Sequence, residues 1–140
     1  EEISQLRLAI EPAAAAYACT LADEDDKQAA IKAFEILDVA AKDNLAEVAV
    51  RNREFHVALV RPGKRLLTTQ LVERLEVLAE RYVLSHLEPA GRGDRAHMEH
   101  RDLLDAWLAG DAAKVQGLLT QHIASTLDDL RAHFTAAQTG

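Results

Sequence analysis

Apolar residues recur along most of this chain at intervals of three and four positions, the spacing of one face of an α-helix. Proline, glycine and short polar residues interrupt the pattern at intervals. The two signals together predict six helices. The first is about Ser4–Leu21, the second begins at the acidic cluster 23–26 and ends near Ala41, and the third is capped by Asp43 and Asn44 and ends at Val60. The last three are Leu66–Leu87, Asp94–Ala109 and a helix that is capped by Asp111 and ends near Phe134, with residues 135–140 frayed.

The junctions between these helices carry residues that chain reversals need. Pro62 and Gly63 end the third predicted helix, and the segment Glu88–Gly93 contains one proline and two glycines, so we expect a loop there. Gly110 is placed to adopt the left-handed conformation, and Asp111 to cap the helix that follows. The last two helices should therefore form a tight antiparallel pair.

The pattern shows no repeat and no linker, so we predict one all-α domain over residues 1–140, an antiparallel bundle of about six helices. Composition agrees with this prediction. The chain has 26 Ala and 20 Leu among 140 residues, both strong helix formers, and only 4% aromatic residues. These figures argue against an all-β fold, and the length suffices for a core without disulfides.

The net charge of −7 comes entirely from the first third, because residues 1–50 hold 4 Lys or Arg against 11 Asp or Glu, whereas residues 51–140 hold 12 of each. Without a basic stripe, this polypeptide is not expected to bind nucleic acid or an anionic membrane by itself. No signal peptide or membrane span is visible, so we expect a cytoplasmic address. The chain starts at Glu1 without an initiator methionine, as expected of a fragment or trimmed domain.

The predicted inward stripe of the fourth helix contains no charged or histidine residue and runs through Leu67, Leu71, Leu75, Leu78 and Tyr82. Polar residues interrupt three others. The third helix carries Asn52 and His56 one turn apart, the fifth carries His100, and the sixth carries His122. Three helices thus each aim one imidazole at the middle of the bundle. His97, beside the glycine-rich segment, is expected to be exposed.

One such histidine alone is best interpreted as a hydrogen-bonded core residue. Three together are harder to explain this way, because each unsatisfied buried polar group costs about 1–3 kcal/mol. A shared metal ion would satisfy all three, and neutral imidazole suits Zn²⁺, Ni²⁺, Cu²⁺ or Fe²⁺. Three histidines with one weak oxygen ligand would leave coordination positions open to a small anion.

Arg7 is a further polar residue on an inward stripe, in a first helix that Pro12 should bend. It has two interpretations of similar weight. One is an i,i+4 ion pair with Glu11, worth about 0.2–0.5 kcal/mol. The other is an anchor for the carboxylate of a ligand, because the planar guanidinium binds an acid through two hydrogen bonds.

These features resemble the FCD domain, the C-terminal effector-binding domain of the FadR subfamily of GntR-type transcription regulators. The resemblance runs from Leu6 to about Phe134. It rests on the following segments in order: Arg7-Leu8-Ala9-Ile10-Glu11 before an Ala-rich helix, Phe55-His56, Pro62-Gly63, His100 ahead of Leu103-Leu104-Asp105-Ala106, Gly110-Asp111, and His122-Ile123.

The resemblance implies a divalent metal ion, most often Zn²⁺ or Ni²⁺, held at the positions of Asn52, His56, His100 and His122. Metal-binding relatives have Asp where this chain has Asn52, so weaker metal affinity is expected. The resemblance also implies a homodimer that binds a small organic acid, with Arg7 as an effector contact. Operator DNA would be bound only through an N-terminal winged helix-turn-helix that this chain lacks.

Two alternatives stay open at this point. A metal-dependent hydrolase or lyase would need a general base, but Glu54, Glu99 and Asp102 are expected by periodicity to face away from the histidines. A helical interaction domain without a ligand would tolerate His100→Leu or be stabilised by it, and no ligand would change its melting temperature. The leading interpretation is an effector sensor without enzymatic activity.

Overall fold

The computed structural model describes the backbone of residues 1–87 and 91–139 and the side chains of residues 1–83 and 91–137. This described part contains no strand. Its helices are α1 (Glu2–Cys19), α2 (Glu24–Asp43), α3 (Val48–Val60), α4 (Leu66–Leu87), α5 (Arg92–Leu108) and α6 (Ala112–Thr139), with short 3₁₀ helices η1 (Leu45–Glu47) and η2 (Arg61–Gly63). The predicted all-α bundle is confirmed.

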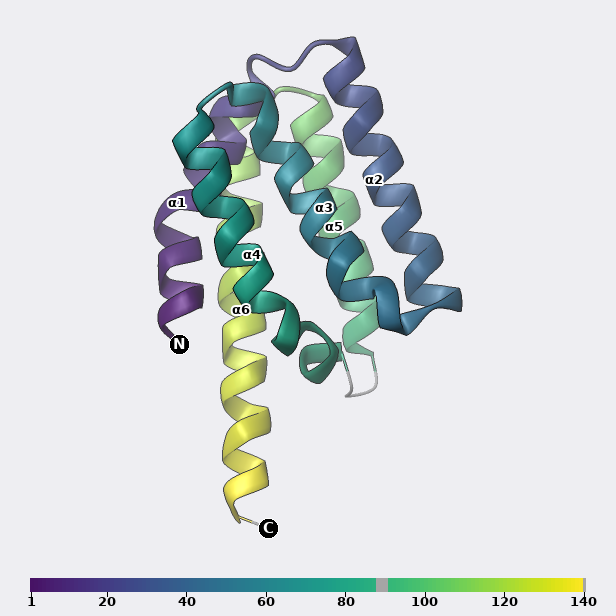
Figure 1. Cartoon of the computed structure of the whole chain (residues 1–140), viewed down its shortest axis with the longest axis vertical. Coiled ribbons are helices and arrows are strands. Elements are labelled where there is room, and N and C mark those ends of the chain that lie inside the picture. Colours follow the sequence, from purple (N-terminus) through teal and green to yellow (C-terminus); the bar gives the residue numbers. More distant parts are fainter. Residues whose placement is uncertain (88–90, 140) are drawn as a thin grey trace.

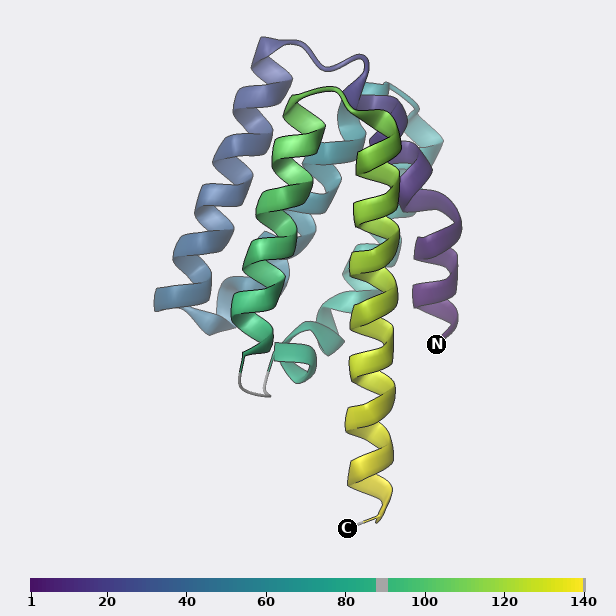
Figure 2. The same ribbon diagram turned by 180° about the vertical axis from the view of Figure 1, so that it is seen from behind.

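The helices run roughly along one long axis, with α2 at one edge and α1 at the other (Figure 1). α6 packs against α1 and α5, and α3 packs against α2 and α4. The two ends of the chain therefore share one side of the bundle. The axis of α1, which contains Pro12, changes direction partway along, and the last turns of α6 project beyond the other helices (Figure 2).

Two of the predicted helix starts are formed as the sequence indicated. The Asp23 side chain accepts a hydrogen bond from the Asp26 backbone at 2.9 Å, and the Asp26 side chain accepts one from the Asp23 backbone at 3.0 Å, which completes a capping box. Gly110 adopts φ +70°, and Asp111 accepts a hydrogen bond from the Lys114 backbone. The α5–α6 reversal thus follows from local sequence.

The predicted cap of the third helix is wrong. Asp43 is the last residue of α2, and the Asn44 side chain makes no capping hydrogen bond. The short helix η1 follows Asn44 and delays α3 to Val48. The chain reverses through this extra turn, which the polar pair at 43 and 44 did not indicate.

Two further boundaries differ from the prediction. α5 begins at Arg92 inside the predicted loop, because Gly91 with φ +83° already makes the turn; residues 88–90 of that loop lie outside the described residues. α6 continues to Thr139 instead of ending at Phe134. Its last turns are rich in alanine, and Arg131 pairs with Glu1 and with Asp128 of the same helix.

The buried face of α4 is rotated from the predicted stripe. Leu67 and Leu71 are 70% and 44% exposed, whereas Leu75 is buried as predicted, together with Val72, Glu76 and Ala79. The predicted stripe consists of four leucines and a tyrosine, so it does not indicate an inward-facing glutamate. Because Glu76 meets a buried arginine of α1, the helix turns that face to the core.

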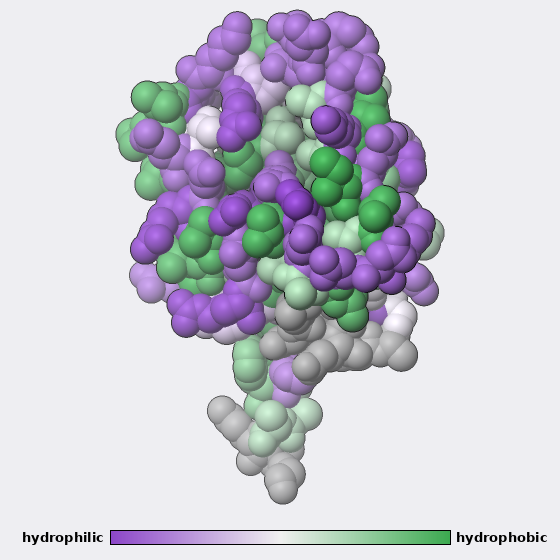
Figure 3. All heavy atoms as spheres, turned by 45° about the vertical axis from the view of Figure 1, so that its right-hand side comes forward, coloured by the Kyte–Doolittle hydropathy of each residue, from purple (hydrophilic) through white to green (hydrophobic). Residues whose placement is uncertain are grey.

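The core centres on Trp107, which is fully buried and donates its indole N–H to the Leu59 carbonyl at 2.9 Å. Phe55, Leu103 and Leu119 are buried with it. Figure 3 shows hydrophobic side chains as separate patches among hydrophilic ones on the face in view. Within the described residues, no helix combines the length and apolar character needed to cross a membrane.

Candidate functional site

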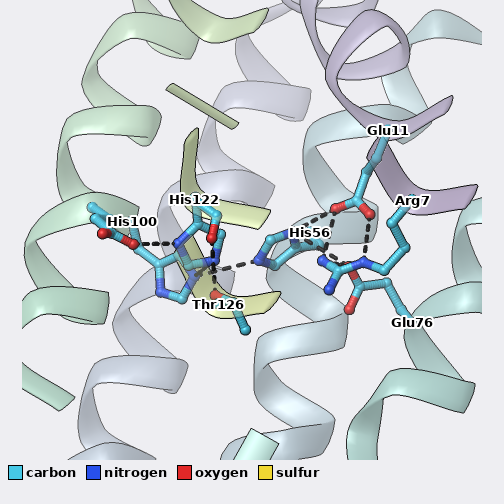
Figure 4. A network of polar contacts seen from close by, with 8 residues as sticks. Arg7, Glu11, His56, Glu76, His100, His122 and Thr126 are labelled. Atoms are coloured by element: carbon cyan, nitrogen blue, oxygen red, sulfur yellow. Dashed lines mark hydrogen bonds and ion pairs between the residues drawn. The ribbon is translucent and has the colours of Figure 1, made fainter. Parts of the chain in front are cut away.

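Three imidazoles from three helices meet inside the bundle: His56 on α3, His100 on α5 and His122 on α6, here called the histidine cluster (Figure 4). All three side chains are buried. The Nε2 atom of His100 lies 3.3 Å from that of His56 and 3.2 Å from that of His122. The three ligand atoms all lie within 4.8 Å of one another, so three of the four predicted metal ligands converge.

In two of these rings a carboxylate contacts the Nδ1 atom, while Nε2 faces the other histidines. Nδ1 of His56 lies 2.6 Å from Glu11 Oε1, and Nδ1 of His122 lies 2.6 Å from Glu99 Oε2. A carboxylate accepts hydrogen bonds, so each Nδ1 is assigned as the N–H donor. In the neutral rings, Nε2 of His56 and of His122 then present lone pairs to the centre of the cluster. The same carboxylate–histidine arrangement orients metal-binding histidines in proteins.

The donor set fits a metal ion. Nε2 of His100 lies between two lone pairs, and a neutral ring has one N–H at most, so it can satisfy only one of its two neighbours. At least one of the two Nε2–Nε2 contacts would then have no proton between its nitrogens. Tetrahedral Zn–N bonds of about 2.0–2.1 Å place ligand nitrogens about 3.3–3.4 Å apart, close to the distances from His100 to His56 and from His100 to His122.

On the far side of His56 lies a second group of polar residues, Arg7, Glu11 and Glu76, here called the charge cluster (Figure 4). Nε of Arg7 lies 2.9 Å from Glu11 Oε2, and its Nη2 lies 2.5 Å from Glu76 Oε1. Glu76 also approaches Nδ1 of His56 at 3.4 Å. The predicted i,i+4 pair of Arg7 and Glu11 is present, but it is buried and shared with a second carboxylate from α4.

Burial and charge act in opposite directions on these groups. Burial disfavours the charge of Arg7, but Glu11 and Glu76 outweigh it and raise the pKa of Arg7. Burial likewise opposes ionised Glu11, yet Arg7 and His56 hold the pKa of Glu11 well below its ordinary value. At Glu76 burial prevails over the attraction of Arg7 and raises the pKa to about 7.

Burial and nearby charges combine differently in setting the pKa values of two histidines of the cluster. Burial alone would lower the pKa of His56, but the nearby Glu76 and Glu11 raise it overall. Burial lowers the pKa of His100 well below its ordinary value, and His122 and His56 add to the effect. His100 is therefore a neutral ring, the form that binds metal ions.

A cavity of about 810 Å³ has His100 and His122 in its wall, together with Arg7 and Asn52. The rest of the wall comes from the first turns of α1, the second half of α2, Leu45 of η1, Val48 of α3, the later parts of α4 and α6, and the start of α5. Two members of the histidine cluster, His100 and His122, therefore face a space large enough for a small organic ligand.

A family profile for the FCD domain matches residues 2–125. The chain belongs to the FCD domain family. FCD domains are the C-terminal effector-binding domains of GntR/FadR-type regulators. A search among curated proteins finds no match.

Asn52 stands on α3 one turn before His56, and its half-buried side chain lines the cavity of this FCD domain. His97 lies one turn before His100, and its side chain is 40% exposed, as expected. It bonds Asp38 at 2.9 Å and stays out of the histidine cluster. Among the described histidines, the sequence thus separated the three that converge from one that does not.

Sequence reasoning missed Glu76 and Glu99 of the FCD site, and it paired Glu11 with Arg7 but not with His56. Glu99 was expected to face away from the histidines, and this was wrong: it lies next to His100 in sequence but reaches His122 on α6. Glu76 lies one position after Leu75, which belongs to the predicted apolar stripe of the fourth helix, so that stripe does not indicate an inward glutamate. Glu11 carried a usable signal, because it follows Arg7 by four residues and precedes a buried alanine-rich segment, where an exposed ion pair is not expected.

Proposed function

We propose that this FCD domain is a metal-dependent sensor of a small carboxylic acid. His56, His100 and His122 would hold a divalent ion, Zn²⁺ or Ni²⁺, and Asn52 would be a weak fourth ligand. The convergence of three Nε2 atoms, two of them oriented by carboxylates, carries this proposal. When bound, the ion supplies coordination positions that a carboxylate oxygen can take.

The protein's own groups would complete the effector site. Arg7 lies in the cavity wall and uses Nε and Nη2 for its ion pairs, while Nη1 makes no hydrogen bond within the described residues. We assign this remaining nitrogen the role of an effector contact. Glu11 and Glu99 hold His56 and His122 in the orientation that directs Nε2 toward the cluster.

Membership in the FCD family supports a regulatory role. In the proposed full protein, a homodimer of this domain would carry winged helix-turn-helix modules, bind operator DNA through them and act in the cytoplasm. An effector that favours one arrangement of the bundle would change the spacing of those modules. The change can be only as large as the effector's difference in affinity for the two arrangements.

An enzymatic role is a weaker proposal for this site. A metal-dependent hydrolase or lyase needs a general base close to the reacting group. Glu11 and Glu99 are each bonded to an Nδ1 atom of the cluster, and Glu76, which lies 3.4 Å from Nδ1 of His56, is paired with Arg7. This geometry orients ligands, and membership in a family of regulatory domains favours a sensor.

The direct test is the metal content of protein purified without chelator, measured by elemental analysis, together with thermal melting in Zn²⁺ or Ni²⁺. We expect bound metal in the native chain and in His97→Ala, and its loss in His100→Ala. His97 is a matched control because it lies one turn away on α5 outside the cluster. Native protein without bound metal, and with a melting temperature that neither ion changes, would contradict the proposal.

A further inference from the structure

The cavity wall next to the histidine cluster is largely hydrocarbon. α2 contributes Phe34 and Leu37, and α6 contributes Ile123, Leu127 and Leu130. These side chains supply much of the apolar wall of the space, to which α1 and α4 also contribute. A ligand that fills the cavity therefore meets apolar surface over most of its length.

The polar side chains of the wall are mostly engaged with the protein itself. Lys42 and His97 both pair with Asp38, at 2.8 and 2.9 Å. Arg131 pairs with Glu1 across the gap between α6 and α1. Hydroxyl groups of a sugar acid or hydroxy acid would have to compete with these existing contacts.

The same holds at the end of the cavity near Arg7. Its positive charge already faces two buried carboxylates, Glu11 and Glu76. Arg7 therefore adds a hydrogen-bond donor but little net positive charge for an anionic ligand. If the proposed function is right, the bound metal ion is the main countercharge, so the ligand needs one carboxylate at that end.

We propose that the effector is a monocarboxylic acid with an extended apolar body. This inference rests on the proposed metal site and makes its ligand more specific. The carboxylate lies at the histidine cluster, with Arg7 as a hydrogen-bond donor, and the hydrocarbon body lies between α2 and α6. The cavity volume of about 810 Å³ agrees with this assignment, since a three-carbon acid would leave most of that space to water.

Titration calorimetry on the zinc-loaded 140-residue chain tests the proposal with butanoate, hexanoate and octanoate against lactate and gluconate. Each methylene buried in the apolar cavity should tighten binding by about three- to fourfold, or roughly 80- to 250-fold from butanoate to octanoate. Lactate and gluconate should bind more weakly than octanoate. An affinity that does not change with chain length, or tighter binding of gluconate or lactate, would overturn the proposal.

A pair of variants on α6 locates the apolar body. Leu130→Gln changes the cavity wall, whereas Leu118→Gln changes a half-buried leucine of the same helix outside the cavity. We expect Leu130→Gln to weaken octanoate by about tenfold and Leu118→Gln to leave it unchanged. Equal effects of the two variants would refute the placement.

Zinc binding is measured first, because it distinguishes failure of the proposed metal site from failure of the apolar-body assignment. Absence of zinc binding by the native chain would overturn the proposed function and with it this inference. Normal zinc binding with a flat chain-length series would overturn only the apolar-body assignment.

Discussion

The charge cluster and the histidine cluster are both polar, both buried, and joined at His56, yet they differ in how their polar groups are satisfied. In the charge cluster, Arg7 and two carboxylates are donors and acceptors for one another. In the histidine cluster, two rings present lone pairs to a third that has one proton at most. A buried polar group satisfied within the protein indicates architecture, whereas a group left with surplus lone pairs indicates a ligand.

The strongest test of this comparison removes the cation of the charge cluster. Arg7→Met leaves Glu11 and Glu76 buried without their partner, and we expect a loss of about 3–5 kcal/mol in the free energy of unfolding, measured with urea. The double variant Arg7→Met/Glu76→Gln should recover part of the loss, because glutamine is neutral, whereas Glu76 without Arg7 must either carry a buried charge or take up a proton.

Arg51 provides the matched control for this experiment, since it also pairs with two glutamates, Glu47 and Glu54, but on an exposed face of the bundle. Arg51→Met should leave the free energy of unfolding nearly unchanged, because exposed ion pairs are screened by water. A similar loss from Arg7→Met and Arg51→Met would show that burial of the charge cluster does not matter.

The histidine cluster should respond in the opposite way. In chelator, His100→Leu should keep or raise the free energy of unfolding, because it removes the ring caught between two lone pairs. With zinc at a hundred times its Kd, the native chain should gain about 2.7 kcal/mol and His100→Leu should gain nothing. Chemical denaturation with and without zinc measures both values. A large loss in chelator would indicate a satisfied structural histidine.

The carboxylate behind His122 tests whether orientation contributes to metal affinity. Glu99→Gln replaces the acceptor at Nδ1 of His122, and we expect the zinc Kd to rise about 10- to 100-fold in a competition titration. Asp102→Asn, an exposed carboxylate one turn along α5, should leave the Kd unchanged. Equal Kd values for native protein and Glu99→Gln would mean that the ring is held by packing alone.

Helical periodicity predicted six helices and the convergence of His56, His100 and His122, because spacing along a helix decides which side chains share a face. It did not predict the partners. Glu99 reaches His122 across a helix interface, and Glu76 faces inward only because α4 is rotated toward Arg7. Such contacts depend on how helices are rotated against each other, and no local pattern encodes this. Asn52 remains to be decided: the sequence predicts it as a metal ligand, and the structure places its side chain in the cavity wall.

The smallest effect is expected at that position. Asn52→Asp replaces a neutral amide oxygen with a carboxylate, a better ligand for a divalent ion, so the zinc Kd should fall by about tenfold. The free energy of unfolding in chelator should not rise, because the new charge then has no ion beside it. Asn44→Asp, an exposed asparagine between α2 and η1, controls for added charge. If Asn52→Asp and Asn44→Asp change the Kd equally, position 52 acts through the general electrostatic field, and the ion is held by the three histidines alone.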